Sequence, residues 1–159
     1  MNTDPRTDLE HKPAAKSKPW LKTDFSFFEM ITLRWADNDA YGHINNAHYY
    51  SFFDTAVDAF LLHHALRQLI TGHYQTLVVA SECRYFSQVS APGTIRVGVR
   101  PGRLGRSSTT YEVAVFTDDS NEAAAQGLFV HVCVEKQSQR PTETPKNFRD
   151  ALQGLVAGQ

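Results

Sequence analysis

The chain has 159 residues, which is enough for one domain with a core of its own. Its formal net charge is −1 at pH 7, so charge gives no global reason to expect nucleic acid or an anionic membrane as a partner. No run approaches the roughly 20 apolar residues that span a bilayer.

Residues 1–23 mix charged and small residues with three prolines, and they lack the apolar stretch of a secretion signal. This composition buries too little apolar area to offset the entropy of ordering. We therefore expect a mobile tail over residues 1–23, with Trp20 docking near its end, followed by a single domain over residues 24–159. Cys83 and Cys133 lie in apolar strand-like runs, which favours buried thiols in a reducing compartment and a cytoplasmic protein.

A first strand is expected over residues 27–35 and a long helix over residues 47–70. In the second segment, apolar residues recur mostly at steps of three and four, in a stripe broad enough to need cover on more than one side. A helix of about 24 residues would be about 36 Å long. Other elements of the chain must therefore wrap around it.

Four later segments have the composition of strands, and the last three alternate apolar and polar residues with a period of two. They are residues 76–89, 94–100, 108–117 and 122–136. The short, turn-rich connections predict that the last three strands form an antiparallel meander, and a terminal helix is expected to turn Phe148, Leu152 and Leu155 inward. The order predicts an α+β fold, with a curved antiparallel sheet of five or six strands wrapped around one long central helix.

The segment before the helix carries more polar residues than a helix start needs. Asp37, Asp39, His43, Asn45 and Asn46 all precede the apolar stripe, whereas one side chain suffices as a cap. The N–H groups and positive dipole end of a helix N-terminus can stabilise charge that develops on a carbonyl oxygen. A neighbouring carboxylate can act on water as a general base or attack a carbonyl itself.

The string DNDAYGHINNAHYYSFFD at residues 37–54 resembles the start of acyl-CoA thioesterases of the 4-hydroxybenzoyl-CoA thioesterase family, which have the hotdog fold. The family pattern is Asp-x-Asp-x-x-Gly-His-x-Asn-Asn, then a small residue, any residue and an aromatic one, and every fixed position is met. The resemblance extends in outline over residues 24–138. It implies hydrolysis of an acyl-CoA to the free acid and CoA without a cofactor. It also implies a homodimer, or a dimer of such dimers, with active sites at the dimer interface.

The resemblance also implies roles for single residues. The family's catalytic aspartate maps to Asp39, as base or nucleophile, and its carbonyl-polarising amide maps to Asn46, with His43 as a supporting side chain. The residues expected to contact substrate are Tyr41, Gly42 and Asn45 in this loop, and Gly105, Arg106, Ser107 and Ser108 in a turn that would meet CoA. That turn also has the composition of an ordinary hairpin. Asp37 is expected to be structural, pairing with Arg34 or with loop amides.

Two other functions fit the same residues. One is a hotdog hydratase or dehydratase acting on enoyl thioesters, and the other is a non-catalytic protein that binds acyl thioesters. No metal site is expected, because His43 and His48 are five residues apart and do not share a helical face. The acyl group stays open, as does the choice between CoA and acyl carrier protein.

Overall fold

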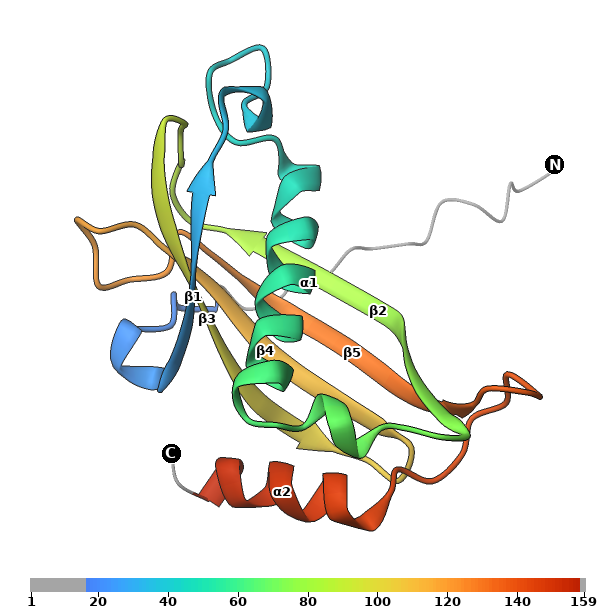
Figure 1. The fold of residues 1–159 in the computed structure, drawn as a ribbon. Coiled ribbons are helices and arrows are strands. Elements are labelled where there is room, and N and C mark those ends of the chain that lie inside the picture. Colours follow the sequence, from blue (N-terminus) through green and yellow to red (C-terminus); the bar gives the residue numbers. More distant parts are fainter. Residues whose placement is uncertain (1–16, 158–159) are drawn as a thin grey trace, which may run out of the picture.

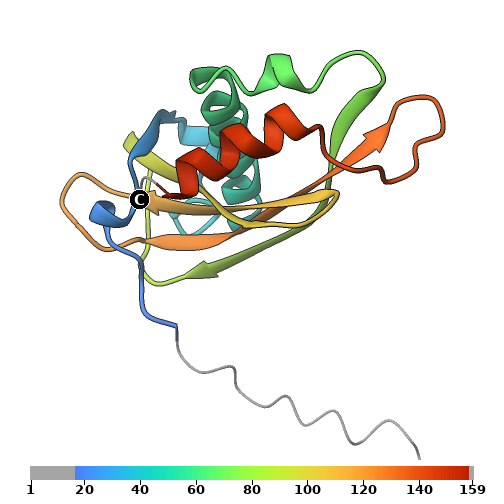
Figure 2. The ribbon, with the colours of Figure 1, turned by 90° about the horizontal axis from the view of Figure 1, so that it is seen from below.

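The computed structural model describes residues 17–157, which form an antiparallel sheet with two helices on one face (Figures 1 and 2). The strands are β1 (Phe27–Leu33), β2 (Tyr74–Tyr85), β3 (Gly93–Leu104), β4 (Ser108–Phe116) and β5 (Ala125–Glu135), in the spatial order β1-β3-β4-β5-β2. The helices are α1 (Asn46–His63) and α2 (Lys146–Ala157), and short 3-10 turns occur at Lys22–Asp24, Trp35–Asp37 and Arg67–Leu69. The α+β class and the antiparallel β3-β4-β5 meander are confirmed. None of the helices in this part of the chain has the length and apolar character needed to cross a membrane.

Helix α1 packs mainly against β1 and β3. Its buried residues recur at the three- and four-residue steps of a helix lying on a sheet. They are Tyr49, Phe52, Phe53, Ala56, Val57, Phe60 and Leu61. The terminal helix α2 adds Phe148 and Leu152 to the same core, with Leu155 partly buried against it, so the predicted inward face of α2 is confirmed.

Helix α1 is shorter than the sequence pattern predicts. It ends at His63, and Arg67–Leu69 forms a separate 3-10 turn. Ala65 has a φ of 54°, which redirects the chain, and Leu66 is buried beside the core. The prediction of one helix over residues 47–70 was wrong at its end, because apolar residues after His63 reach the core from a turn.

The strand predictions are correct in number and order, but the bounds of all five strands differ from the expected ranges. Strand β1 stops at Leu33, because Asp37 accepts a hydrogen bond from the backbone N–H of Arg34 and starts a turn there. Strand β2 covers Tyr74–Tyr85 instead of residues 76–89, and β3 continues to Leu104.

The segment before β1 lies on the face of the sheet opposite α1 (Figure 2). The rings of Trp20 and Phe25 have centroids 5.9 Å apart, and the Arg100 guanidinium lies over both rings. The expected docking of Trp20 is therefore observed. Most of the predicted tail, residues 1–16, lies outside the described residues.

Strand β2 forms one edge of the sheet and exposes apolar side chains. The exposed apolar side chains at this edge are Leu77, Val78, Val79, Tyr85 and Phe86, of which Val79 is 59% exposed. Val79 also sits at a β-bulge, where the register with β5 shifts. An apolar edge strand of this kind is typical of a surface that pairs with another chain. The two cysteines are both free thiols, with Cys133 buried and Cys83 only partly buried.

Gly127 of β5 lies where β2 leaves no room for a side chain. A Cβ atom at this position would overlap the backbone carbonyl of Glu82. We expect Gly127→Ala to lower the free energy of unfolding by about 3 kcal/mol, because strand backbone would have to move. Urea unfolding measures this loss. Gly154→Ala in α2 is the matched control, since nothing lies within 4 Å of the added Cβ, and it should keep or raise stability. Equal stability of Gly127→Ala and the wild type would contradict the expectation.

Candidate active site

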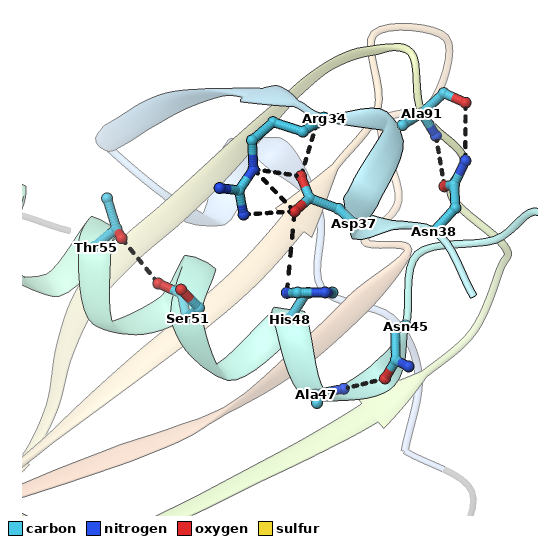
Figure 3. A network of polar contacts seen from close by, with 9 residues as sticks. All are labelled: Arg34, Asp37, Asn38, Asn45, Ala47, His48, Ser51, Thr55 and Ala91. Carbon is cyan, nitrogen blue, oxygen red and sulfur yellow. Dashed lines mark hydrogen bonds and ion pairs between the residues drawn. The ribbon is translucent and has the colours of Figure 1, made fainter.

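Asp37 is the buried anchor of the loop that leads into α1 (Figure 3). Its carboxylate accepts hydrogen bonds from the Arg34 backbone N–H (2.7 Å to Oδ2) and from Arg34 Nη2 (2.7 Å to Oδ1). Its backbone carbonyl accepts a hydrogen bond from the N–H of Asn45, and Nδ1 of His48 lies 4.0 Å from Oδ1. The hydrogen bonds from the Arg34 side chain lower the pKa of Asp37, against the opposing effect of burial. The expected pairing with Arg34 is confirmed.

This ion pair predicts a pH dependence of stability. Because the pKa of Asp37 is lower in the folded chain than the usual value of about 4, its contribution is present above that value and is lost as pH falls through the folded pKa. We expect Asp37→Asn to lower the free energy of unfolding at pH 7 by about 1–2 kcal/mol, since the guanidinium is largely exposed. The variant should also lose less stability than the wild type between about pH 4 and pH 2.

Urea unfolding at a series of pH values tests both parts of this prediction. Asp118→Asn removes an exposed carboxylate that pairs with Arg96 at 3.3 Å. This control should change stability by no more than about 0.5 kcal/mol. Parallel pH profiles for Asp37→Asn and the wild type would contradict the role given to Asp37.

Two pairs of residues join this loop to the connection between β2 and β3 by hydrogen bonds. Nδ2 of Asn38 donates to the Ala91 carbonyl at 3.1 Å, and the Ala91 N–H donates to Oδ1 of Asn38 at 3.0 Å. The N–H of Ile44 donates to the Val89 carbonyl at 2.8 Å. Hydrogen bonds near both ends of the loop therefore hold the polar residues before α1 in one conformation.

Asp39 organises the turn between these contacts. Its Oδ1 accepts hydrogen bonds from the backbone N–H groups of Tyr41 (2.8 Å) and His43 (3.2 Å), and its own N–H donates to the His43 carbonyl at 2.7 Å. Gly42 closes the turn with a φ of 80°, a conformation that favours glycine. Asp39 is half-buried, and the Tyr41 side chain is 84% exposed. Within one chain, Tyr41 therefore faces solvent.

The start of α1 has a capping side chain and an N–H group that the helix does not use. Oδ1 of Asn45 accepts a hydrogen bond from the Ala47 N–H at 3.0 Å, which makes Asn45 the N-cap (Figure 3). Asn46 is the first helical residue, and within residues 17–157 its backbone N–H has no hydrogen-bond acceptor. This N–H lies at the positive end of an 18-residue helix.

His43 and Asn46 line one small cavity of about 210 Å³. Its other lining residues are Ile44, Tyr49, Tyr85, Ser87, Gln88 and Val89. The Tyr85 hydroxyl donates to the Asn46 carbonyl at 3.3 Å. Burial raises the pKa of Tyr49 to about 12 and raises that of Tyr85 as well, so both phenols stay protonated. The structure thus brings two of the three predicted catalytic residues to one cavity, whose lining does not include Asp39.

The predicted CoA-contacting turn lies at the other end of the sheet. It follows the last residue of β3, whereas the loop that leads into α1 contacts Val89 and Ala91, just before the first residue of β3. The 12 residues of β3 separate the two ends by about 36 Å at 3.3 Å per residue. Within one chain, Gly105, Arg106, Ser107 and Ser108 are therefore not brought together with Asp39, His43 and Asn46.

The turn is fixed by its neighbours. The Arg106 carbonyl accepts hydrogen bonds from the Thr144 N–H at 3.0 Å and from the Arg149 guanidinium. The Ser107 carbonyl accepts a hydrogen bond from the Cys133 N–H at 2.7 Å. The Arg106 side chain is 84% exposed, with Nε 3.6 Å from a carboxylate oxygen of Glu143, so its guanidinium is accessible.

A second, larger cavity was not predicted from the sequence. It has a volume of about 720 Å³ and lies between α1, β2 and β5, with Asp54, Asp58 and His131 in its lining. Its residues are spread over distant segments, and His131 occupies an ordinary position in the alternation of β5. No local pattern could have revealed it. No group of three or more His, Cys, Asp or Glu side chains in the described part of the chain is arranged to hold a metal ion.

Comparison with known proteins shows which family the chain belongs to. Residues 33–152 match the family model of the thioesterase-like superfamily. The chain belongs to the thioesterase-like superfamily. This membership confirms the relationship to hotdog thioesterases that residues 37–54 indicate.

Individual relatives share most of their length with the chain. The uncharacterised protein YsmA of Bacillus subtilis (strain 168) is 30% identical over 133 residues, which cover 82% of this chain and 88% of YsmA. The crystal structure of the PA5185 protein from Pseudomonas aeruginosa PAO1 superimposes with a TM-score of 0.78 at 46% identity, covering 87% of this chain and 96% of that one. Slr0204 from Synechocystis, a 1,4-dihydroxy-2-naphthoyl-CoA thioesterase, gives a TM-score of 0.72 at 16% identity, covering 82% and 97%. Slr0204 therefore shares the fold.

Proposed function

We propose that the protein is an acyl-CoA thioesterase that hydrolyses an acyl thioester to the free acid and CoA. The backbone N–H of Asn46 carries this proposal, because it lies at the first residue of α1 and has no acceptor within residues 17–157, and because Asn46 lines a cavity. A thioester carbonyl placed there would receive a hydrogen bond at the positive end of the helix. A donor fixed before the reaction begins stabilises the forming oxyanion by about 3–4 kcal/mol.

Asp39 supplies the second requirement, which is activation of the attacking oxygen. The N–H groups of Tyr41 and His43 engage only Oδ1, so Oδ2 can take a proton from water or attack the carbonyl itself. His43 borders the cavity and is placed to hydrogen-bond water or the leaving sulfur. The thiolate needs little proton help, because thiol pKa values lie near 8–9.

A homodimer that joins two β2 edges would bring the separated parts of the site together. A two-fold axis through an antiparallel β2 pair sets the Tyr85 end of one strand beside the Tyr74 end of the other. The turn Gly105–Ser108 lies near that second end, because Ser108 pairs with Val132 and Tyr74 pairs with Glu135. Each site would then take its helix start from one subunit and its turn from the partner, and the paired sheets would wrap around the helices.

In this arrangement the exposed guanidinium of Arg106 can contact the phosphates of CoA, and the hydroxyls of Ser107 and Ser108 can donate hydrogen bonds to it. The exposed apolar residues of β2 would become buried between the two subunits. Both features support the dimer, because the Arg106 guanidinium and the Val79 side chain are exposed in a single chain.

The test is release of free thiol from a panel of acyl-CoAs and acyl carrier protein thioesters. We expect turnover of at least one acyl-CoA at about 1 s⁻¹ or faster, with one free acid formed per thiol. Loss of enoyl-CoA absorbance without thiol release would indicate a hydratase instead. Tight binding of acyl-CoA without any turnover would indicate a non-catalytic binding protein, and either result would refute the proposal.

A further inference from the structure

Asn38 stands between the two aspartates of the motif, and its side chain bonds to a distant part of the chain (Figure 3). The carboxamide uses both of its polar atoms, because Nδ2 donates to the Ala91 carbonyl at 3.1 Å and Oδ1 accepts from the Ala91 N–H at 3.0 Å. Asparagine side chains in loops usually hydrogen-bond to backbone groups close to them in the sequence. Asn38 instead joins positions 53 residues apart, so local turn formation does not account for its contacts.

The turn that follows, residues 39–43, makes its hydrogen bonds within itself. Oδ1 of Asp39 accepts from the N–H groups of Tyr41 and His43. The Asp39 carbonyl accepts from the Gly42 N–H at 3.1 Å, and the Asp39 N–H donates to the His43 carbonyl. Within the residues that the structure describes, no hydrogen bond joins this turn to another segment. The position of the Asp39 carboxylate therefore depends on how the two ends of the turn are attached.

Both ends of this turn are attached to the connection between β2 and β3. Before the turn, the Asn38 side chain bonds to Ala91. After the turn, the Ile44 N–H donates to the Val89 carbonyl at 2.8 Å, and Val89 also lines the small cavity at the start of α1. Of these two hydrogen-bonded attachments, only the one at Asn38 is made by a side chain. A single substitution can therefore remove it and leave the backbone groups unchanged.

We propose that Asn38 is a positioning residue of the hydrolysis, which fixes the place of the Asp39 carboxylate relative to the unused N–H of Asn46. This inference rests on the proposed thioesterase function, in which the carboxylate activates the attacking oxygen and the N–H holds the carbonyl oxygen. Both groups must act on one thioester carbonyl at the same time, and a displacement of about 1 Å can lower a rate by about 10²-fold. Because Asn38 acts through Asp39 and not on the substrate, its effect belongs in kcat and not in KM.

The first measurement is thiol release from the acyl-CoA that the wild type turns over fastest, well below the melting temperature of every variant. We expect Asn38→Ala to lower kcat by about 10- to 100-fold and to keep KM within about twofold of the wild type. Asn121→Ala is the matched control and should keep wild-type kcat, because Asn121 is an exposed residue of the connection between β4 and β5. Asn38→Gln keeps a donor and an acceptor on a longer side chain, so it should lose less activity and replaces Asn38→Ala if that variant does not fold.

A double-mutant cycle shows whether Asn38 acts through Asp39. In the Asp39→Asn background the basic oxygen is already absent, so its position no longer matters. Asn38→Ala should then lower kcat by no more than about threefold further, because residues that act as a unit are not additive. A loss that was independent of the carboxylate, such as a general loosening of the fold, would have the same factor in both backgrounds.

Hydrogen exchange tests the attachment of the turn without turnover. The N–H groups of Asp39 and Tyr41 are hydrogen-bonded inside the turn, so their exchange measured by NMR reports how often the turn opens. We expect Asn38→Ala to speed this exchange by about 10-fold or more, because two hydrogen bonds that hold the turn are lost. Asn121→Ala should leave it unchanged.

Three results would each overturn the inference: wild-type kcat in Asn38→Ala, the same factor of loss in both backgrounds, or unchanged exchange in the turn. If no acyl-CoA is hydrolysed but exchange rises in Asn38→Ala, the thioesterase function fails and the hold of Asn38 on the turn stands. If hydrolysis depends on Asp39 and not on Asn38, the function stands and the inference fails.

Discussion

Asp39→Asn is expected to lower kcat for acyl-CoA hydrolysis by about 10²- to 10⁴-fold, the usual contribution of a general base. The substitution removes the basic oxygen but keeps an amide oxygen that can accept the hydrogen bonds from Tyr41 and His43. The turn before α1 should therefore keep its conformation. Activity falls because the attacking oxygen is no longer activated, and the melting temperature should stay close to that of the wild type.

Asp118→Asn is the matched control for activity, because it makes the same change at a largely exposed surface ion pair. It should retain wild-type kcat. Asp39→Ala should lose as much activity as Asp39→Asn and some stability in addition, because the turn loses its acceptor. Wild-type turnover by Asp39→Asn would remove Asp39 from the chemistry.

Val79→Asp is expected to raise the dimer dissociation constant at least 100-fold and to reduce activity in proportion to the dimer that is lost. Val79 is exposed at the bulge of the β2 edge, where a two-fold dimer would bury it. The aspartate would bring its charge into an apolar interface once from each subunit, and like charges and unpaired buried groups both oppose association. Sedimentation equilibrium measures the dissociation constant, and thiol release measures activity at the same concentrations.

Thr32→Asp provides the comparison at the opposite edge of the sheet. Thr32 is an exposed residue of β1, whose only strand neighbour in the described part of the chain is β3. This variant should remain dimeric and active. If Val79→Asp were monomeric yet fully active, each site would be complete within one chain, and the role proposed for the partner's turn would be refuted.

The residues that could be interpreted from the sequence are those whose environment is local. The alternation in β3, β4 and β5 predicts their pairing, because a strand with one buried face must repeat every second residue. Asp37 and Arg34 are three residues apart, and their pairing could be predicted. The end of α1 could not be predicted, because an apolar residue such as Leu66 continues the helical pattern in the sequence whether it lies in the helix or in a turn that packs on the core.

The candidate site divides in the same way. The motif singles out Asp39 and Asn46 as candidate site residues. The hydrogen bonds that Asp39 accepts belong to a turn closed by the positive φ of Gly42, which a spacing pattern does not specify. The motif also gives no distance between the helix start and the turn at Arg106. That distance follows from the length and direction of β3. The cavity at His131 is formed by segments far apart in the sequence, so only the folded chain reveals it.

The segment that carries Trp20 limits how the protein can build larger assemblies. The backbone N–H of Trp20 donates a hydrogen bond to Oε1 of Gln126 in β5 (2.6 Å), and the N–H of Ala123 donates one to the Trp20 carbonyl (2.9 Å). The outer surface of the sheet is therefore partly occupied by the chain's own polypeptide. Two dimers that stacked back to back through these surfaces would meet across Trp20 and its neighbours instead of bare strands. The geometry of any tetramer built in this way would be set by about ten residues that precede the first strand.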